Sequence, residues 1–256
     1  MTEQQIVTTA IERHARPSAA FAEREAEAVW LLQQAARVFA GLVVQATSMG
    51  VEDMVVSDLI VRHGLDIPMD TLDTGALHPQ TLELIDRAQT HWGRPITVWR
   101  PAADAVAAFV DEHGPRAMYA NVDLRKACCA VRKLEPLSRM LAGRAAWITG
   151  LRRQQSEHRQ QVAGRVVDAD GRVKFSPLAG WELGDVWHYV AEHGVPYNPL
   201  HDQFFPSIGC APCTRAISLG EDIRAGRWWW EQGDTKECGL HAAPATTEPT
   251  KKGASA

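Results

Sequence analysis

Short apolar runs alternate with longer amphipathic stretches along most of the chain. Within 19–40, apolar residues such as Val29, Leu32 and Ala36 recur at the spacing of one helix face, and Gly41 ends that pattern. The apolar run at 42–46 predicts a buried strand. Further strands are predicted at 67–72, 96–99 and 146–149, and further helices at 51–62, 78–91, 103–112 and 183–192. Strands that alternate with helices in this way predict an α/β fold, with a mostly parallel sheet and helices on both faces.

Three other segments complete the prediction. Residues 166–175 alternate in polarity around an Asp-Gly pair, which predicts a β-hairpin. Residues 124–133 contain neither proline nor glycine and are expected to open a helix that runs to residue 141. Residues 242–256 are small and polar without periodicity, which predicts a disordered tail. Because there is no internal repeat and no clear linker, residues 1–241 are predicted to form one domain.

Composition places the chain among ordinary globular proteins. Of its 256 residues, 45% are hydrophobic and 23% are charged, which is enough to bury a core. The net charge of -4 gives no reason to expect nucleic acid or a membrane surface as a partner, so an anion site needs local groups of Arg and Lys. No apolar run approaches the ~18 residues of a membrane span, and the first residues lack a signal-peptide pattern. We therefore expect a cytoplasmic protein.

The five cysteines are the most informative residues of the chain. Cys128 and Cys129 are adjacent, Cys210 and Cys213 are separated by two residues, and Cys238 stands alone near the end. An odd number that includes an adjacent pair makes a poor disulfide framework, so metal binding and catalysis explain these thiols better. A ligand sulfur must be fixed and shielded, whereas an attacking sulfur must be accessible and close to positive charge. We interpret the two pairs as metal ligands and Cys238 as a nucleophile.

The spacing of the two cysteine pairs bears on the kind of metal. Structural zinc sites usually combine two C-x-x-C turns, and adjacent cysteines do not fit that habit because their sulfurs diverge. Diverging sulfurs suit a [4Fe-4S] cluster, in which each thiolate binds a different iron. Thiolate softness does not separate zinc from iron, so a zinc site and unligated thiols both stay open. Lys126, Arg132 and Lys133 lie alongside, and they either offset the charge of the site or form a solvated basic face.

Arginines gather at 152–159, directly after a predicted strand, and at 224–227. Guanidinium groups suit phosphate or sulfate oxygens, and ligands of parallel sheets collect beyond the carboxyl ends of the strands. The turns at 48–50 and 73–75 belong to the same edge, where Ser48 and its neighbours offer a hydroxyl and backbone N–H groups at a helix N-terminus. This turn lacks the Gly-Lys-Ser/Thr end of a Walker A loop, and its residues also fit simple helix capping. The sequence therefore predicts an anion site at this edge.

The surroundings of Cys238 favour a reactive thiol. Lys236 or His241 could lower its pKa, and Gly239 permits a close backbone approach. The three consecutive tryptophans at 228–230 cannot all be buried by one helix face, so at least one is expected to dock this segment or to pack at an interface. The alternative is an inert cysteine near the end of the chain.

These residues together resemble the assimilatory adenosine 5′-phosphosulfate reductases. The resemblance runs from about residue 46 to residue 241 and rests on several separate segments. They are 48–53, 72–75, 77–79, 126–129, 149–153, 207–213, 224–230 and 236–241. Members of this family have an adenine nucleotide alpha-hydrolase-like fold, related to that of the pyrophosphatase-loop enzymes. They reduce a sulfonucleotide to sulfite and AMP with thioredoxin as the electron donor.

The resemblance implies a role for each matching residue. Cys238, within a C-terminal catalytic segment at 228–241, matches the nucleophile that takes the sulfonate, and a thioredoxin or a glutaredoxin-like donor then releases sulfite. The ligands of a [4Fe-4S] cluster are matched by Cys128, Cys129, Cys210 and Cys213. Substrate-binding positions are matched by Lys133, Arg152, Arg159, Arg224 and Arg227, with the adenosine expected near Ser48, Gly50 and Asp73. Whether the chain forms a homo-oligomer stays open.

One departure and three alternatives accompany the resemblance. The family has Gly-Tyr where this chain has Phe204 and Phe205, which leaves the geometry of that loop open. A related branch acts on 3′-phosphoadenosine 5′-phosphosulfate and usually lacks the four ligand cysteines, so that substrate, or dual specificity, is the first alternative. A pyrophosphatase-loop ATPase is disfavoured because the 48–53 turn lacks a glycine-rich, lysine-bearing form. A non-enzymatic iron-sulfur or zinc-stabilised protein would not need Cys238.

Overall fold

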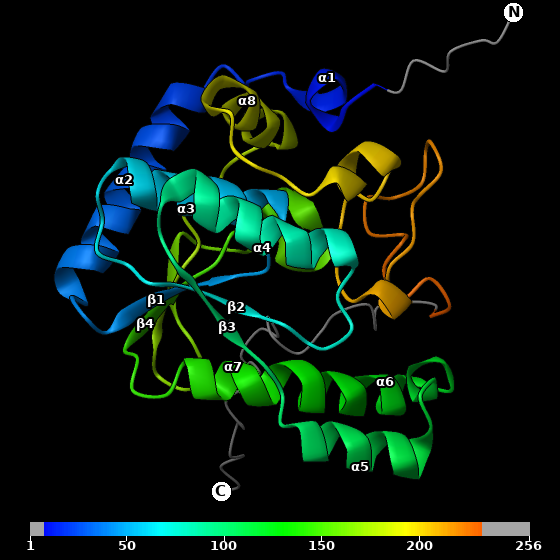
Figure 1. Cartoon of the computed structure of the whole chain (residues 1–256). Helices are drawn as coiled ribbons and strands as arrows, with labels where there is room; N and C mark the ends of the chain where they lie inside the picture. Colours follow the sequence, from blue (N-terminus) through cyan, green and yellow to red (C-terminus); the bar gives the residue numbers. More distant parts are fainter. Residues whose placement is uncertain (1–7, 232–256) are drawn as a thin grey trace, which may run out of the picture.

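The computed structural model describes residues 8–231 and has a six-stranded sheet at its centre, in the order β3-β2-β1-β4-β6-β5 (Figure 1). The strands are β1 (Val43–Thr47), β2 (Met69–Leu72), β3 (Ile96–Trp99), β4 (Ala146–Ile148), β5 (Arg165–Val167) and β6 (Val173–Phe175). Every neighbouring pair is parallel except β5, which runs antiparallel to β6. The prediction of a mostly parallel sheet is therefore confirmed. Cys238 and the predicted tail at 242–256 lie outside the described residues.

Helices cover both faces of the sheet (Figure 1). One face carries α2 (Phe21–Val38), α3 (Val51–Arg62), α4 (Pro79–Trp92) and α8 (Leu183–His193), and the other carries α6 (Val122–Cys129) and α7 (Glu135–Met140), with α5 (Ala103–His113) outside them. Alternate residues of β1 serve the two faces, because Val43 packs in the larger core and Val44 packs with Leu141 and Trp147. None of the helices in the described part of the chain is long and apolar enough to cross a membrane.

The elements begin and end close to their predicted positions. The predicted helix at 51–62 is α3, and the predicted strand at 96–99 is β3, with no shift of their bounds. Strand β2 begins two residues later than predicted, after Pro68, which has no N–H to donate to a ladder. Helix α4 has proline in its first turn and ends at Trp92, and the residue that follows, Gly93, has a left-handed φ of 61°.

The predicted helix at 124–141 is not continuous, and this prediction is corrected. Helix α6 ends at Cys129, one π-helical stretch covers Ala130–Leu134, and α7 follows from Glu135. A π turn holds more residues than an α turn, so it changes the direction of the side chains that come after it. The π-helical stretch directly follows the adjacent cysteines and contains Arg132 and Lys133.

The order of the strands locates the crevice of the sheet. The chain passes from β1 through α3 to β2 on one side, whereas β4 lies on the other side of β1. In open α/β sheets, the loops that follow two such strands diverge and leave a crevice beyond their carboxyl ends. We therefore expect ligands beyond Thr47 and Ile148, the last residues of β1 and β4.

An N-terminal helix that the sequence analysis did not predict braces the loop before the second cysteine pair. Helix α1 (Ala10–His14) begins with a capping box in which Thr9 and Glu12 bond to each other's backbone N–H groups. The N–H of Ala10 donates to a carboxylate oxygen of Asp202 over 2.7 Å. The first helix of the chain is thereby attached to the 3₁₀ turn at Pro199–Gln203.

The loop that departs from the family pattern keeps a left-handed turn. Phe204 has a φ of 63°, which is unusual for a residue with a side chain. The guanidinium of Arg13 lies 4.6 Å from the centroid of the Phe204 ring and donates to the carbonyl oxygen of His201 over 2.6 Å. Contacts with α1 therefore support the left-handed turn at Phe204.

We predict that Asp185→Asn destabilises the protein near neutral pH. The buried Asp185 carboxylate accepts bonds from the N–H groups of Ser18 and Glu182, over 2.7 and 2.9 Å, and from Arg24 over 2.7 Å. Burial opposes the charge, but these bonds prevail and hold the pKa of Asp185 below its usual value. Removing the charge is expected to cost about 1–3 kcal/mol of unfolding free energy.

The pH dependence provides a second measurement of the same effect. A lowered pKa stabilises the native state above the unfolded pKa of about 4, and this contribution is lost as the pH falls through the native pKa. In denaturant titrations, the unfolding free energy of Asp185→Asn should therefore fall less than that of the wild type as the pH is lowered. Asp170→Asn is the control, because its side chain is 71% exposed in a surface pair with Arg172. Equal stability of wild type and Asp185→Asn at pH 7 would contradict the prediction.

Candidate functional site

A cavity of about 220 Å³ opens at the crevice, beyond the carboxyl ends of β1, β2 and β4. Ser48 and Gly50 line it from the loop after β1, Leu72 and Thr74 from the loop after β2, and Arg152 from the loop after β4. Apolar side chains at 46, 137, 140 and 147 supply a non-polar wall, whereas other walls carry Lys and Arg. A cavity with one apolar wall and several cations suits a ligand that has both a flat base and an anionic group.

The carboxylate of Asp53 joins the loops after β1 and β4. Its Oδ2 accepts from the N–H and the hydroxyl of Ser48, over 2.8 and 2.5 Å, and its Oδ1 accepts from the N–H of Gly150 over 2.6 Å. Burial raises the pKa of Asp53, although these bonds act in the opposite direction. A Cβ atom on Gly150 would lie 2.7 Å from the Asp53 nitrogen, so the two loops touch there. Ser48 therefore reaches the cavity with its hydroxyl already bonded to Asp53.

Arg152 lines the cavity with its charge already paired. Its side chain is almost fully buried, and its Nε and Nη2 donate to Glu52 Oε1 over 3.0 and 2.8 Å. Burial opposes the Glu52 charge, but Arg152 and Gln155 prevail and lower the pKa of Glu52. The sequence analysis predicted Arg152 for the anion site but did not predict its ion pair with Glu52. The structure assigns Arg152 to a wall of the cavity, as half of an ion pair.

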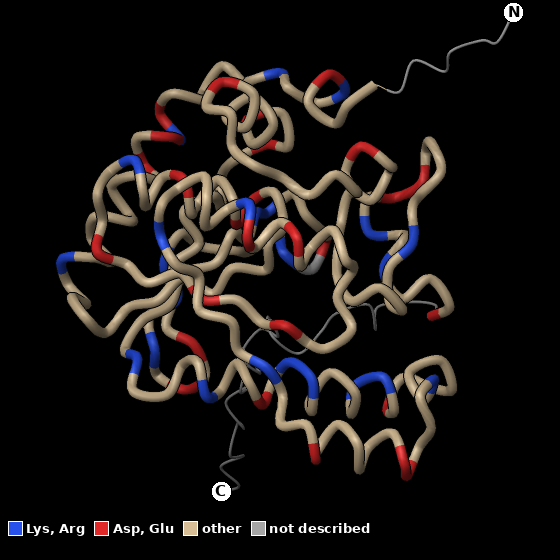
Figure 2. The backbone as a smooth tube through the Cα atoms, viewed as in Figure 1, with Lys and Arg blue, Asp and Glu red and all other residues tan. Residues whose placement is uncertain are grey.

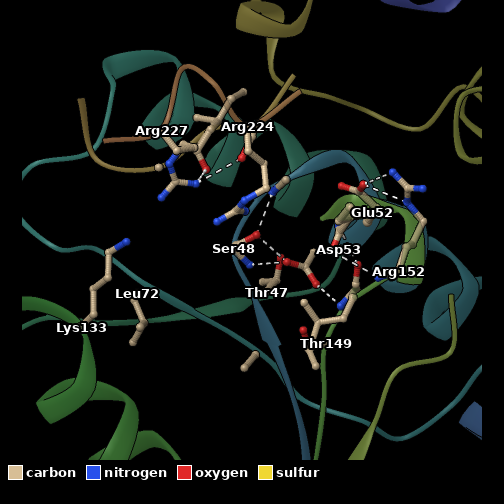
Figure 3. Close-up of a pocket in the computed structure, with 18 of the residues that line it drawn as sticks. Thr47, Ser48, Glu52, Asp53, Leu72, Lys133, Thr149, Arg152, Arg224 and Arg227 are labelled. Atoms are coloured by element: carbon tan, nitrogen blue, oxygen red, sulfur yellow. Dashed lines mark hydrogen bonds and ion pairs between the residues drawn. The ribbon is translucent and has the colours of Figure 1, made fainter. Parts of the chain in front are cut away.

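Three other cations surround the opposite end of the cavity. Figure 3 shows Lys133, Arg224 and Arg227 around this end, with Ser48 nearby, while Glu52 and Arg152 lie at the far end. Lys133 comes from the π-helical stretch, and the two arginines come from the segment before the tryptophans. The structure therefore brings residues that are about 90 positions apart in the sequence to one end of the cavity.

Close packing defines the position of Arg227. Its Nη1 lies 3.3 Å from Ser207 Oγ and 3.4 Å from the carbonyl oxygen of Ile208, and its guanidinium lies 4.7 Å from the centroid of the Trp228 ring. A Cβ atom on Gly209 would come within 2.4 Å of a guanidinium nitrogen. Glycine at 209 is therefore required by the space that Arg227 occupies.

Two predicted residues contribute differently. Arg159 lines the cavity, and its Nη1 donates to Gln155 over 2.7 Å. Asp73 does not line the cavity, although its neighbours Leu72 and Thr74 do. Its carboxylate accepts from the N–H of Gly75 over 2.9 Å and pairs with Arg100 over 3.0 Å. Asp73 therefore shapes the turn after β2, and the structure does not place its side chain at the ligand position expected from the sequence.

The four cysteines of the two pairs line a second cavity, of about 100 Å³. Cys128 and Cys129 end α6, whereas Cys210 precedes a 3₁₀ turn and Cys213 ends it, and each of the four is 8% exposed. The turn is attached to the loop after β2, because the N–H of Ala211 donates to a carbonyl oxygen there over 2.7 Å. Segments about 80 residues apart thus bring four thiols to one place.

These thiols are buried and bordered by cations. Burial raises the pKa of Cys213 to about 11 and also raises that of Cys128. Arg125, Arg132 and Lys133 line the same cavity. Figure 2 shows Lys and Arg positions recurring along the segment from α6 to α7. Thiols with a raised pKa are poor nucleophiles, so Cys128 and Cys213 are not suited to attack a substrate.

The donor set bears on which metal group could fit. As the side chains stand, residues 8–231 contain no group of three or more His, Cys, Asp or Glu residues arranged to hold a metal ion. The four thiols nevertheless share one cavity, and the Thr74 hydroxyl lies 3.2 Å from the Cys210 sulfur. Four buried soft donors in one cavity suit a metal group bound by thiolates.

The two cavities share a wall. Lys133 and Trp228 line both the sheet cavity and the four-cysteine cavity. Trp228 is 1% exposed, and its φ of 43° places it in the left-handed region. The sequence analysis predicted that at least one of the three tryptophans docks its segment, and Trp228 does so here. The roles of Glu52 and Asp53 were missed, since two acidic residues in a first helical turn look like ordinary capping.

Comparisons with known proteins agree with this geometry. The phosphoadenosine phosphosulfate reductase domain model matches residues 42–216. A protein of Allochromatium vinosum named adenosine 5′-phosphosulfate reductase is 53% identical over 219 residues, which is 85% of this chain and 85% of that protein.

Solved structures extend the comparison to the fold. Phosphoadenylyl-sulfate reductase from Candida auris, in a phosphate complex, has a TM-score of 0.61 at 25% identity, covering 77% of this chain and 97% of that one. FMN adenylyltransferase from Candida glabrata, with FAD and pyrophosphate, has a TM-score of 0.52 at 12% identity, covering 90% of this chain and 82% of that one, which shows the fold alone. The expected nucleotide alpha-hydrolase-like fold is confirmed. With its sheet, cavity and motifs in agreement, this chain belongs to the phosphoadenosine phosphosulfate reductase domain family.

Proposed function

We propose that this protein reduces adenosine 5′-phosphosulfate to sulfite and AMP in the assimilation of sulfate. The observation that carries the proposal is the wall that two cavities share, one with cations for an anionic nucleotide and one with four buried thiols. The name of the Allochromatium vinosum relative supports the same substrate. The wall consists of Lys133 and Trp228, so the two sites act on the same end of the substrate.

The cavity suggests how the nucleotide binds. The adenosine lies against the non-polar wall at 46, 72, 137 and 147, below the loop that Ser48 and Asp53 hold. The phosphosulfate lies among Lys133, Arg224 and Arg227, whose charges match its oxygens. These cations are already in place before the reaction, so they stabilise charge that develops on the bridging oxygen as AMP departs.

The chemical step is a transfer of the sulfonate to Cys238. The Cys238 thiolate attacks the sulfur of the substrate, an S–S bond forms, and the S–O bond to the phosphate breaks with its electron pair leaving on AMP. A thioredoxin dithiol, or a glutaredoxin-like donor, then attacks the Cys238 sulfur and releases sulfite from the S-sulfonate. The second thiol of the donor closes a disulfide and restores the Cys238 thiolate, so the dithiol supplies the two electrons.

The four-cysteine cavity fits a [4Fe-4S] cluster held by Cys128, Cys129, Cys210 and Cys213. Four buried soft donors in one cavity, two of them adjacent in the sequence, support this choice over a zinc ion. A bound cluster supplies structural and electrostatic support to the shared wall. The chain's own contribution is to hold Lys133 and the 3₁₀ turn beside the substrate. We place the enzyme in the cytoplasm, where thioredoxin keeps thiols reduced.

The Cys238→Ser variant is predicted to release no sulfite. A serine hydroxyl cannot form the S-sulfonate, whereas the cofactor ligands are untouched, so the visible chromophore of the anaerobically purified protein should remain. Sulfite release from adenosine 5′-phosphosulfate, with and without thioredoxin, measures the effect. Turnover of Cys238→Ser at the wild-type rate would show that another residue is the nucleophile.

A comparison of two nucleotides completes this experiment. The wild type should release sulfite faster from adenosine 5′-phosphosulfate than from its 3′-phosphorylated form. Faster release from the 3′-phosphorylated form would assign the protein to the other branch of the family. Pyrophosphate production from ATP, without sulfite release, would instead indicate a pyrophosphatase-loop ATPase.

The cofactor assignment predicts the elemental content of the protein. Protein purified without oxygen should contain iron and acid-labile sulfide in equal amounts, and Cys210→Ala should lose both because one of the four ligands is missing. Cys238→Ala serves as the matched control and should keep both. Zinc in place of iron in the wild type, with no sulfide, would overturn the cluster.

Gly209→Ala is predicted to weaken substrate binding without unfolding the protein. The new methyl group meets the flexible end of Arg227, so the guanidinium has to leave its position. Losing a charge-assisted bond of about 1.5–3 kcal/mol should raise the KM for adenosine 5′-phosphosulfate by roughly 10- to 100-fold. In the control Gly180→Ala, the nearest atom is an Arg153 nitrogen at 3.9 Å, an ordinary contact. If the KM of Gly209→Ala were unchanged, Arg227 would not contribute to substrate binding.

A further inference from the structure

A buried ion pair joins the cysteine helix to the C-terminal segment. Arg125 lies one turn before Cys129 on α6, and its Nε and Nη2 donate to the two carboxylate oxygens of Glu231, both over 2.9 Å. The two side chains are only 1% and 4% exposed. A bidentate pair of this kind restricts orientation as well as distance. Position 231 is therefore held in one place relative to α6.

The same guanidinium contacts the wall that the two cavities share. Arg125 lies 4.7 Å from the centroid of the Trp228 ring, and Arg227 lies at the same distance from that ring. Arg125 also interacts with the Cys129 side chain and lines the four-cysteine cavity. One side chain thus contacts a candidate cofactor ligand, the indole that supports a substrate-binding arginine, and the last described residue of the chain.

Stability alone gives a poor account of this arrangement. Withdrawing two charges from water opposes their attraction, and well-packed apolar side chains often serve as well or better. The best-supported use of a buried polar pair is to select one arrangement among several that would otherwise pack equally well. The arrangement that this pair selects is the position of the segment from Arg227 to Glu231 against α6.

Position 231 matters for the chemistry because Cys238 follows it by seven residues. An extended chain spans at most about 3.3–3.6 Å per residue, so the place where residue 231 is held limits the volume that the thiol can reach. An error of about 1 Å in the approach of a reacting group can reduce the rate by about 10²-fold. The start of the segment is thus one constraint on where the thiol can approach the substrate.

We propose that Arg125 is a positioning residue for the sulfonate transfer. Its pair with Glu231 fixes the start of the segment that carries Cys238, and its contact with Trp228 supports Arg227 in the sheet cavity. Helix α6 therefore sets the place from which the segment with Cys238 continues, and it supports a substrate-binding arginine. This inference rests on the proposed function, since it concerns the approach of Cys238 to the bound substrate.

Two variants separate the two roles of Arg125. Glu231→Gln breaks the ion pair but leaves Arg125 beneath Trp228, whereas Arg125→Met removes both the pair and the cation beside the ring. Glu221→Gln is the matched control, because it breaks a bidentate pair with Arg215 in the same part of the chain. The side chains of Glu221 and Arg215 are 33% and 38% exposed, so this pair is not buried. Iron and sulfide content and a melting curve establish that each variant is folded and loaded.

Two measurements are made on each folded variant. The rate of S-sulfonate formation on Cys238 is followed by mass spectrometry in a single turnover with adenosine 5′-phosphosulfate and no reductant. Substrate affinity is measured by calorimetry with each change placed in the Cys238→Ser background, where no reaction occurs. If Glu231→Gln does not fold, Glu231→Asp takes its place, since it keeps the charge and shortens the side chain by one methylene.

The proposal makes a different expectation for each variant. Glu231→Gln should form the S-sulfonate about 10- to 100-fold more slowly with an affinity within about twofold of wild type, whereas Arg125→Met should lose both rate and affinity. Glu221→Gln should match the wild type in both measurements. If both variants formed the S-sulfonate at the wild-type rate and only melted at a lower temperature, Arg125 would have a structural role alone and the proposal would be wrong. If the wild type itself formed no S-sulfonate, the proposed function would fail before this inference is tested.

Discussion

The buried carboxylate of Asp53 holds the substrate side of the site together. Its two oxygens receive bonds from Ser48 and Gly150, so the loops after β1 and β4 meet although about 100 residues separate them. A carboxylate out of water requires such donors, and the cost of leaving it unpaired keeps the loops in register with each other. The cavity opens between these loops, and Lys133 and Arg227 project toward an edge that is already rigid.

Local sequence patterns were enough to predict most of the fold and part of the site. Buried parallel strands and amphipathic helices each have their own periodicity, which is why α3 and β3 appear where they were predicted. Because the carboxyl ends of the strands share one edge, Ser48 and Arg152 could also be expected at one cavity, whereas Lys133 was expected there only from the resemblance to the reductases. The pairing of Arg152 with Glu52, and of Asp73 with Arg100, could not be expected, since each pair joins segments that come together only through tertiary packing.

The cysteines show the same division between local and distant information. Their spacing indicated ligands, and the structure places the buried Cys128 and Cys213 side chains in one cavity. The π-helical stretch after Cys129 was not visible in the sequence, because a run without proline or glycine looks like a continuous helix. That stretch carries Lys133, which lines both cavities. The turn that breaks the helical repeat is thus also the part of the chain that joins the two sites.

The attachment of α1 has a consequence for how the protein can be shortened or fused. A chain that begins after residue 15 would retain every strand of the sheet, yet it would lose the bonds from Ala10 to Asp202 and from Arg13 to the backbone of His201. The left-handed Phe204 would then have no cation beside its ring. Deletions or bulky fusions near the amino terminus are therefore transmitted to the loop ahead of Cys210, far along the sequence but adjacent in space.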